Sequence, residues 1–508
     1  MLKKIDNKLL FYIIPFSLGI ISSFSLPPYN FFLLNFLTFP SLLIFLLSNP
    51  SKNKWKSFLI GWLFGFGYFI SNIYWITNSL TFEEIFLPLI PIAFLMTPLF
   101  LGLFYGFVTF ISSFLNLDRN FSSILMFAAI FSFVEFVRGH ILGGFPWNLI
   151  AYSWLEYTSF LQLLSLIGTY SFNLISITFF LLPSIIFFNK SLTSKILTII
   201  FALFFFGTNI YFGKNVIDKY NKVEFTNLDT TIKIISPKIE INRFFKNEDP
   251  GITINELIKL SDPKEEKETL FIFPEGILTS IYLEDLNIYK EIFEENFSEK
   301  HKIIMGINSH NNLEIYNSLV FLDNNLNILG KYNKNKLVPF GEFLPLENIF
   351  SKFGLKKITQ GYQSFSSANE RKILEINNIK FLPLICYEII YSGKLNKNIQ
   401  QFNFIVNISE DGWFGDSVGP HQHFSHSIFR SIEEGKNLIR SANNGISAHI
   451  NPIGQVMKKI ESTEKGVLEI KSFKEIPQTI FGKYGNKIFF YFLFFYITLS
   501  FFIKKKKK

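Results

Sequence analysis

The sequence predicts a membrane protein with two parts: a polytopic helical domain and one large α/β layered domain that faces water. Two observations indicate membrane helices. The mean hydropathy of the 508 residues is +0.28, and 18% are charged, against roughly 25% in soluble proteins. The apolar excess lies in residues 1–213 and about the last twenty residues. The third observation is that the polar segment between them alternates strand-like apolar runs with helical stretches, which is typical of an α/β layered domain.

Runs of about 20 apolar residues are long enough to cross a bilayer as helices. We expect eight such spans, at 9–25, 31–48, 57–77, 86–113, 121–138, 158–189, 195–213 and 486–503. The first has a basic flank but no clear cleavage site, and more spans follow it, which favours a helix over a signal peptide. The predicted domains are 1–213 with seven spans, 214–485 in water, and 486–508 with the eighth span and a basic tail.

The basic residues next to the spans predict the orientation. With eight spans they fall on one side, at Lys3, Lys4, Lys8, Lys52, Lys54, Lys56, Arg119, Lys190, Lys195 and the lysine tail 504–508. The opposite loops 26–30 and 78–85 have no lysine or arginine, and Arg138 is the one exception. The positive-inside rule then places both termini in the cytoplasm and 214–485 on the far side. The net charge of +9 fits these flanks and anionic-lipid contact, so we expect no nucleic-acid partner.

The segment 214–485 contains apolar runs that we expect to be buried strands, as in sheets covered on both faces. They are 230–237, 269–275, 302–308, 317–323, 380–388 and 402–409. We expect helices over Glu284–Asn296 and Phe424–Arg440, and a hairpin over Asn311–Gly330.

Polar residues that end these strands are candidates for chemistry, because α/β sheets bind ligands at the carboxyl ends of their strands. Glu275 follows the strand of FIFPEG, Cys386 ends the strand of LICYE, and Lys334 lies in the loop KYNKNKLVPFGEFLP. A cysteine beside a base and a cation is a plausible nucleophile. Taken singly, Glu275 is as consistent with a helix cap, Lys334 with a solvated lysine, and Cys386 with a small buried hydrophobe.

The phrases around these residues resemble the bacterial apolipoprotein N-acyltransferases. FPEG, YNKNKLVPFGEFLP, CYE and the stretch DGWFGDSVGPHQHFSHSIFRSIEEGKNLIRSANNGISAHINPIG carry the resemblance, with GGFPWN (143–148) and YWITNS (74–79) in the apolar part. The resemblance covers essentially the whole chain. It implies an eight-helix protein of the bacterial inner membrane whose nitrilase-like (carbon–nitrogen hydrolase) α-β-β-α sandwich domain faces the periplasm.

The resemblance also implies roles for single residues. The family's catalytic Glu, Lys and Cys fall on Glu275, Lys334 and Cys386. Lys334 matches because it lies two residues after a tyrosine and three before Leu-Val-Pro. The supporting positions fall on Glu342, Tyr387 and Glu388. Where the family has an aromatic in a Lys-Trp context this chain has Arg243-Phe244, and Ser409–Gly415 replaces a related family stretch while keeping its aspartate.

The implied reaction is acyl transfer through a thioester. Cys386 takes an acyl chain from a membrane phospholipid and passes it to the free α-amine of a diacylglyceryl-cysteine at a lipoprotein N-terminus. Glu275 is the expected base, with Glu388 the other candidate, and Lys334 the expected oxyanion stabiliser. The partners are the phospholipid donor, the apolipoprotein and the bilayer. The loop 139–157 is expected to contact acyl chains, and no cofactor is implied.

Three other interpretations stay open. The same three residues suit a membrane-tethered amidase or nitrilase that hydrolyses a small amide. The cluster His421, His423 and His426 has metal-binding residue types, but no acidic ligand is placed near it, so we expect no metal. A transporter without chemistry is disfavoured because Glu135 and Arg138 are the only charged residues deep in a span.

Overall fold

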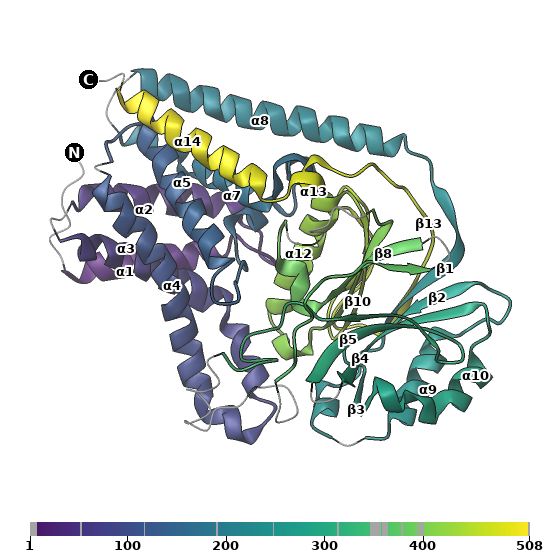
Figure 1. The fold of residues 1–508 in the computed structure, drawn as a ribbon. Coiled ribbons are helices and arrows are strands. Elements are labelled where there is room, and N and C mark those ends of the chain that lie inside the picture. The colour runs from purple at the N-terminus through teal and green to yellow at the C-terminus, as the bar shows by residue number, and fades with distance from the viewer. Residues whose placement is uncertain are drawn as a thin grey trace. The chain divides into compact units, whose positions relative to one another are not determined.

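The computed structural model describes residues 8–50, 53–115, 117–188, 192–246, 248–311, 314–345, 357, 364–376, 379–393, 395 and 401–505. The chain divides into two compact units, Met1–Asp218 with Lys483–Lys508, and Lys219–Gly482. The first unit is helical and the second contains the sheets (Figure 1).

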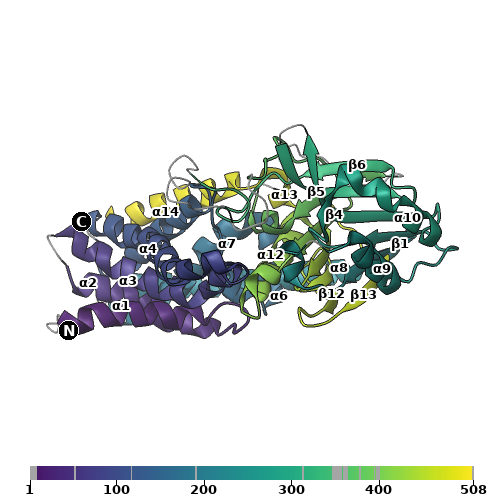
Figure 2. The ribbon, with the colours of Figure 1, turned by 90° about the horizontal axis from the view of Figure 1, so that it is seen from below.

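The first unit is built from α-helices joined by short 3-10 turns. The α-helices are α1 Lys8–Ser23, α2 Asn35–Ser48, α3 Lys54–Asn72, α4 Ile90–Phe114, α5 Phe121–Arg138, α6 Thr158–Leu161, α7 Leu164–Leu181, α8 Leu192–Asn221 and α14 Lys487–Lys505, with α13 Ile480–Tyr484 leading into the last. The 3-10 turns are η1 Phe32–Leu34, η2 Tyr74–Leu80, η3 Glu84–Leu89, η4 Ile150–Trp154 and η5 Leu182–Ile186. Helices α1, α2 and α3 lie beside one another in both views (Figures 1 and 2).

All eight predicted spans fall on helical segments, but the number of spans is not settled by their lengths. Among the described residues, five helical segments are long and apolar enough to cross a membrane: Glu84–Phe114, Phe121–Arg138, Leu164–Ile186, Leu192–Asn221 and Lys487–Lys504. A sixth results if α3 and η2, which are bent by 52° at their junction, count together. The two N-terminal helices are shorter and contain Pro15 and Pro40. Eight spans therefore stays a prediction.

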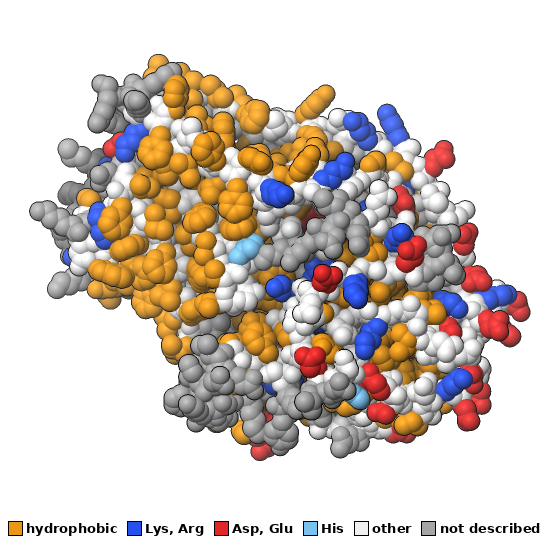
Figure 3. Space-filling model, viewed as in Figure 1, with side chains coloured by type: hydrophobic (Ala, Val, Ile, Leu, Met, Phe, Trp, Pro, Cys, Tyr) orange, Lys and Arg blue, Asp and Glu red, His pale blue; other side chains and the backbone are white. Residues whose placement is uncertain are grey.

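The helices of the first unit differ in how deeply they are buried. Helices α5 and α7 are mostly buried inside the unit, whereas α4, α8 and α14 leave most of their surface outside. Large exposed side chains such as Leu203, Phe204 and Phe494 lie on the outer helices. Figure 3 shows hydrophobic side chains gathered over this unit, while lysine, arginine, aspartate and glutamate side chains gather over the other. An apolar outer surface of this kind suits contact with lipid.

Helices α3 and α4 approach closely because glycines line their contact. A Cβ atom at Gly61 would lie 2.1 Å from the backbone oxygen of Tyr105, and one at Gly65 would lie 2.8 Å from the Cα of Gly102. Small residues at helix contacts let backbones approach and are a common basis for helix association in membranes. The α3–α4 contact therefore has no room for a side chain at Gly61.

The second unit is a four-layer sandwich. One sheet has the order β13-β1-β2-β4-β5-β6, with β3 beside β4, and the other has the order β12-β11-β10-β9-β8-β7. The strands are β1 Thr226–Ser236, β2 Thr269–Ile272, β3 Leu278–Tyr282, β4 His301–Asn311, β5 Glu314–Asp323, β6 Ile328–Asn333, β7 Leu374–Ile376, β8 Ile379–Ile385, β9 Phe404–Glu410, β10 Asn437–Asn443, β11 Ser447–Ile450, β12 Val456–Ile460 and β13 Gly466–Phe473. The helices are η6 Ile241–Phe244, α9 Pro250–Ser261, η7 Leu283–Tyr289, α10 Lys290–Asn296, η9 Cys386–Ile390, η10 Gly412–Phe414 and α12 Gly419–Glu434.

The pleat of the strands separates two cores. Ile234, Phe321 and Val406 belong to the core between the sheets, whereas Ile235 and Val320 pack with the helices α9 and α10 on the outer face of the first sheet. Helix α12 packs on β10 and β11 of the second sheet. The layers therefore run α-β-β-α, which is the expected sandwich.

Several predicted boundaries are wrong. The expected strand 269–275 ends at Ile272 because Pro274 follows and has no N–H to donate. The expected strand 380–388 ends at Ile385, because Cys386 takes a φ of +48°. The expected helix Phe424–Arg440 ends at Glu434, where Gly435 adopts a left-handed conformation, and the chain turns into β10. The hairpin expected within 311–330 continues past that range as β5 and β6.

Substituting Gly61 tests the close contact of α3 and α4. We expect Gly61→Val to lower the midpoint of thermal unfolding in detergent, because overpacking costs roughly 1–3 kcal/mol. Gly207→Ala is the matched control, because a Cβ atom at Gly207 in α8 meets nothing within 4 Å. Equal midpoints for the two variants would contradict the packing described here.

Candidate active site

The predicted residues Glu275, Lys334 and Glu342 lie together. Glu275 follows β2 and Lys334 follows β6, so both come from the ends of strands in the first sheet. The Lys334 ammonium is 3.1 Å from Glu275 Oε1 and 2.8 Å from Glu342 Oε1. All three side chains are buried, with Lys334 only 1% exposed. A buried lysine is costly unless it is paired, and here it has two carboxylates. The cluster of one cation and two carboxylates carries a net negative charge when all three are ionised.

Glu275 is held in place from two sides. It follows β2 after Pro274, and its neighbour Gly276 has a φ of +51°. Its Oε2 accepts a hydrogen bond of 2.9 Å from the backbone N–H of Glu410, at the end of β9 in the other sheet. The backbone of β4 passes so close that a Cβ atom at Gly306 would lie 2.4 Å from the Cα of Glu275. The carboxylate position therefore depends on both sheets.

Asn317 on β5 joins the two carboxylates, a role that no sequence motif indicated. Its Nδ2 donates to Glu275 Oε1 and to Glu342 Oε1, both at 2.8 Å. Its backbone oxygen accepts from the Lys334 N–H at 2.8 Å. Glu342 is anchored in turn, because its Oε2 accepts from Val338 N at 2.9 Å. Asn317 thus orients both carboxylates against one lysine.

Burial and charge act on Lys334 in opposite directions. Burial by itself lowers the pKa of Lys334, but the neighbouring Glu275 and Glu342 carboxylates raise it to a value well above the usual range. The ammonium therefore stays charged at neutral pH. A fixed buried cation is suited to stabilising an oxyanion.

Cys386 lies at a strained point of the backbone. It directly follows β8, has a φ of +48° and begins η9, so the chain turns sharply at the thiol. A non-glycine residue in this region is uncommon, and such strain gathers at functional sites. The thiol is buried, with 8% of the residue exposed. Burial raises the pKa of the Cys386 thiol well above its usual value; Glu275 raises it further, and Lys334 opposes both.

Glu388 stabilises the turn that carries Cys386. Its Oε2 accepts from Ile385 N at 2.9 Å, just before the cysteine. Its Oε1 accepts from Tyr332 OH at 2.6 Å, from the backbone N–H groups of Asn335 and Lys336, and from Arg371 at 3.2 Å. The carboxylate thus ties the strand that precedes Cys386 to the loop that follows Lys334. Tyr387, by contrast, packs edge-on against Tyr391, with ring centroids 5.6 Å apart.

A second buried network supports the backbone of Cys386 and was missed by the sequence interpretation. His423 lies 3.3 Å through Nε2 from the Cys386 carbonyl oxygen and 2.9 Å through Nδ1 from Asp411 Oδ1. Arg440 binds both oxygens of Asp411 at 2.8 and 3.1 Å. Burial by itself raises the pKa of Asp411, but Arg440 and His423 hold it well below its usual range. The network joins the end of β9, α12 and β10 to the backbone of Cys386.

One histidine of the cluster that was considered as a metal site, His423, takes part in a hydrogen-bond network instead. His423 engages Asp411 and the Cys386 carbonyl. In the described part of the chain, no three or more histidine, cysteine, aspartate or glutamate side chains are grouped so that they could hold a metal ion.

Arg243 and Phe244 lie next to Glu275, at the place where the family pattern differs. Arg243 donates to Glu410 Oε2 at 2.5 Å and to the Gly276 oxygen at 3.1 Å, so it links the residues on both sides of Glu275. Phe244 packs against Trp413 with centroids 5.1 Å apart. The sequence showed that Arg243 replaces a residue of the family pattern. It did not indicate that Arg243 pairs with Glu410, because Glu410 is distant in the chain.

The second unit has the fold of the carbon–nitrogen hydrolases: residues 252–471 match the carbon–nitrogen hydrolase family. Residues 18–182 match the apolipoprotein N-acyltransferase N-terminal domain. The class defined by fold and site is therefore a membrane protein with a cysteine-containing carbon–nitrogen hydrolase unit.

Curated relatives identify the family. The chain is 31% identical to an apolipoprotein N-acyltransferase of Agrobacterium fabrum over 471 residues, which is 89% of this chain and 88% of the relative. It is 29% identical to one of Rhodopseudomonas palustris over 92% of this chain and 90% of that protein. The chain belongs to the apolipoprotein N-acyltransferase family, and the resemblance seen in the motifs is confirmed.

Solved structures are more distant. An amidase from Nesterenkonia, with the acetamide moiety of fluoroacetamide on its active-site cysteine, is 12% identical. The match covers 51% of this chain and 95% of the amidase, with a TM-score of 0.37. The protein XC1258 from Xanthomonas campestris is 13% identical over 48% of this chain and 90% of that one, with a TM-score of 0.34.

Opposite shifts of the Cys386 pKa test the electrostatics of the site. Because the Glu275 carboxylate raises this pKa and Lys334 lowers it, we expect Glu275→Gln to lower it and Lys334→Met to raise it. The rate of thiol alkylation as a function of pH measures both, and Cys386→Ala gives the background because the chain has one cysteine. Shifts of the same sign in the two variants would contradict the arrangement.

Proposed function

We propose that the chain transfers an acyl chain from a membrane phospholipid to the free α-amine of a diacylglyceryl-cysteine at a lipoprotein N-terminus. Membership of the N-acyltransferase family supports the reaction class. The observation that carries the residue assignment is the buried contact between Glu275 and Lys334, next to a cysteine on a strained turn. Glu275, Lys334 and Cys386 are the proposed catalytic residues.

In the first step the thiol becomes acylated. Glu275 takes the thiol proton while Sγ attacks the ester carbonyl carbon of the phospholipid. Lys334 stabilises the oxyanion of the tetrahedral intermediate. The ester C–O bond then breaks, Glu275 returns the proton to the leaving alkoxide, and a lysophospholipid departs. The raised pKa of Cys386 fits this order, because the thiol stays protonated until a base acts on it.

In the second step the acyl chain moves to nitrogen. The α-amine of the acceptor cysteine attacks the thioester carbonyl, Glu275 accepts a proton from that nitrogen, and Lys334 again faces the oxyanion. The C–S bond breaks, the departing Cys386 thiolate takes the proton from Glu275, and an amide remains. The amide is less reactive than the thioester, so transfer runs forward.

The geometry favours Glu275 over Glu388 as the base. Glu275 directly contacts the catalytic lysine, and its charge acts on the Cys386 thiol. Glu388 accepts five hydrogen bonds from Ile385, Tyr332, Asn335, Lys336 and Arg371. We therefore assign Glu388 and Glu342 positioning roles. For Tyr387 we propose that its backbone N–H helps bind the oxyanion.

The proposed location is the bacterial inner membrane, with eight spans, the catalytic domain in the periplasm and both termini in the cytoplasm. The lysines beside the apolar segments support this orientation through the positive-inside rule. Both proposed substrates are lipids, so an anchored enzyme meets them at the membrane. The partners are the phospholipid, the diacylglyceryl-modified apolipoprotein and the bilayer.

The acylated enzyme is the most direct test. Incubation of the purified protein with phospholipid alone should add one acyl chain to Cys386, seen by mass spectrometry of the intact chain and its peptides. A diacylglyceryl lipopeptide should then discharge it and gain the chain at its amine. The Cys386→Ala variant should do neither, and release of free fatty acid or of ammonia from an amide, without transfer, would support the amidase interpretation instead.

A further inference from the structure

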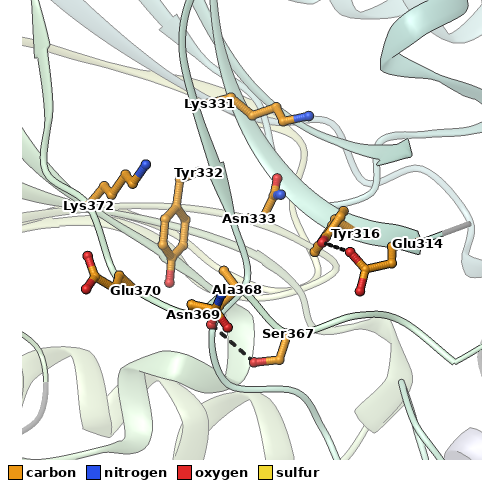
Figure 4. Close-up of a pocket in the computed structure, with 10 residues that line it drawn as sticks. All are labelled: Glu314, Tyr316, Lys331, Tyr332, Asn333, Ser367, Ala368, Asn369, Glu370 and Lys372. Atoms are coloured by element: carbon orange, nitrogen blue, oxygen red, sulfur yellow. Dashed lines mark hydrogen bonds between the residues drawn. The ribbon is translucent and has the colours of Figure 1, made fainter. Parts of the chain in front are cut away.

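The second unit contains a cavity outside the residues assigned to the reaction. It has a volume of about 620 Å³ and lies at the end of the first sheet, where β6 is the edge strand. Lys331, Tyr332 and Asn333 of β6 form one wall, the segment 367–372 faces them, and Glu314 and Tyr316 of β5 complete the lining (Figure 4). Three consecutive strand residues line it, so the cavity reaches both faces and the edge of β6. We call it the β6 groove.

The outward backbone groups of β6 are available to a further strand. Lys334 N donates to Asn317 O, and Tyr332 pairs with Leu319, so in an antiparallel ladder these residues direct their backbone groups toward β5. The alternate residues Lys331 and Asn333 therefore direct theirs away from β5. Within the described part of the chain, no strand pairs with β6 on that side. An unpaired edge of this kind is a template for an added strand.

The opposite wall of the groove is fixed. Ala368 N donates to Lys334 O at 3.0 Å, and Ser367 Oγ donates to Asn335 O at 2.7 Å. The segment is thus tied to the loop that carries the proposed catalytic lysine. A ligand in the groove would lie between a strand edge and a segment that is already anchored.

The charges of the groove indicate what kind of ligand it accepts. Lys331 and Lys372 are balanced by Glu314 and Glu370, so the lining has no net charge. A phosphate site would carry an excess of lysine or arginine, and an acyl-chain site would be apolar. The Lys331 ammonium also donates a hydrogen bond of 3.2 Å to Ser309 Oγ. A neutral, polar lining beside outward-facing backbone groups therefore fits a peptide better than it fits a phosphate group or an acyl chain.

The groove adjoins the proposed site. Asn333 directly precedes Lys334 in the chain. Tyr332, in the wall of the groove, donates to Glu388 at 2.6 Å, and Glu388 holds the N–H of Ile385, the residue before Cys386. An extended chain spans about 3.3–3.6 Å per residue, so the few residues that follow an acceptor cysteine can reach from the site into the groove.

We propose that the β6 groove binds the extended polypeptide that follows the acceptor cysteine, as an added strand on β6. This inference rests on the proposed function and names a subsite for its second substrate. Main-chain pairing supplies affinity without a requirement for particular side chains, so such a subsite accepts acceptors of different sequence. The paired charges at its walls would contact alternate side chains.

Acceptor length and backbone methylation test the groove in the unaltered protein. The acceptors are a diacylglyceryl-cysteine amide and the same group followed by about six polar residues, a typical strand length. We expect the longer acceptor to have a KM about tenfold lower, equivalent to about 1.4 kcal/mol. N-methylation of alternate residues should abolish that gain in one register and leave it in the other. Equal KM for both acceptors, or equal effects in both registers, would overturn the proposal.

Variants of Lys331 provide the second arm. Lys331→Pro removes an outward N–H of β6 together with the lysine side chain, whereas Lys331→Ala keeps that N–H and removes only the side chain. We expect the proline variant, and not the alanine variant, to raise the KM of the long acceptor to that of the short one. Acylation of Cys386 by phospholipid alone reports whether each variant is folded. Failure of that acylation in the unaltered protein would count against the proposed function, while acylation with no dependence on acceptor length would count against the groove alone.

Discussion

The buried ammonium of Lys334, held between Glu275 and Glu342, is the constraint on which the rest of the site depends. A lysine that is 1% exposed is tolerated because two carboxylates and the Asn317 amide surround it. Burial raises the pKa of the Cys386 thiol, the Glu275 carboxylate raises it further, and Lys334 opposes both. In the proposed mechanism, the nucleophile is therefore generated by proton transfer and is not stored as a thiolate.

The sandwich positions these groups because the site uses both sheets. Glu275 follows a strand of the first sheet but accepts from the backbone of Glu410 in the second. Glu388 follows a strand of the second sheet but accepts from Tyr332 in the first. The apolar core between the sheets, including Phe321 and Val406, therefore helps to hold the proposed base and the proposed nucleophile in place relative to each other. The same edge of the first sheet that presents Lys334 also leaves β6 open beside it.

Much of the fold could be predicted from the local sequence, and the errors in the predicted boundaries have local causes. Long apolar runs located the helices at all eight predicted spans. They did not predict the bend after α3 or how short the two N-terminal helices are, so they did not determine the number of spans. Strand-like runs located β1, β2, β4, β5, β8 and β9. The ends were missed at Pro274, Cys386 and Gly435, where a single residue's backbone preference overrides the apolar pattern.

The sequence by itself identified Glu275, Lys334 and Cys386 as candidates for the chemistry, because each lies in a short motif at or just after a strand end. It also determined the division between apolar helices and an α/β unit. Only the tertiary structure decided the partners: Asn317 between two carboxylates, Arg243 on Glu410, and His423 behind the cysteine. These contacts join segments far apart in the chain, and no local periodicity encodes a pairing that forms only when two sheets pack together.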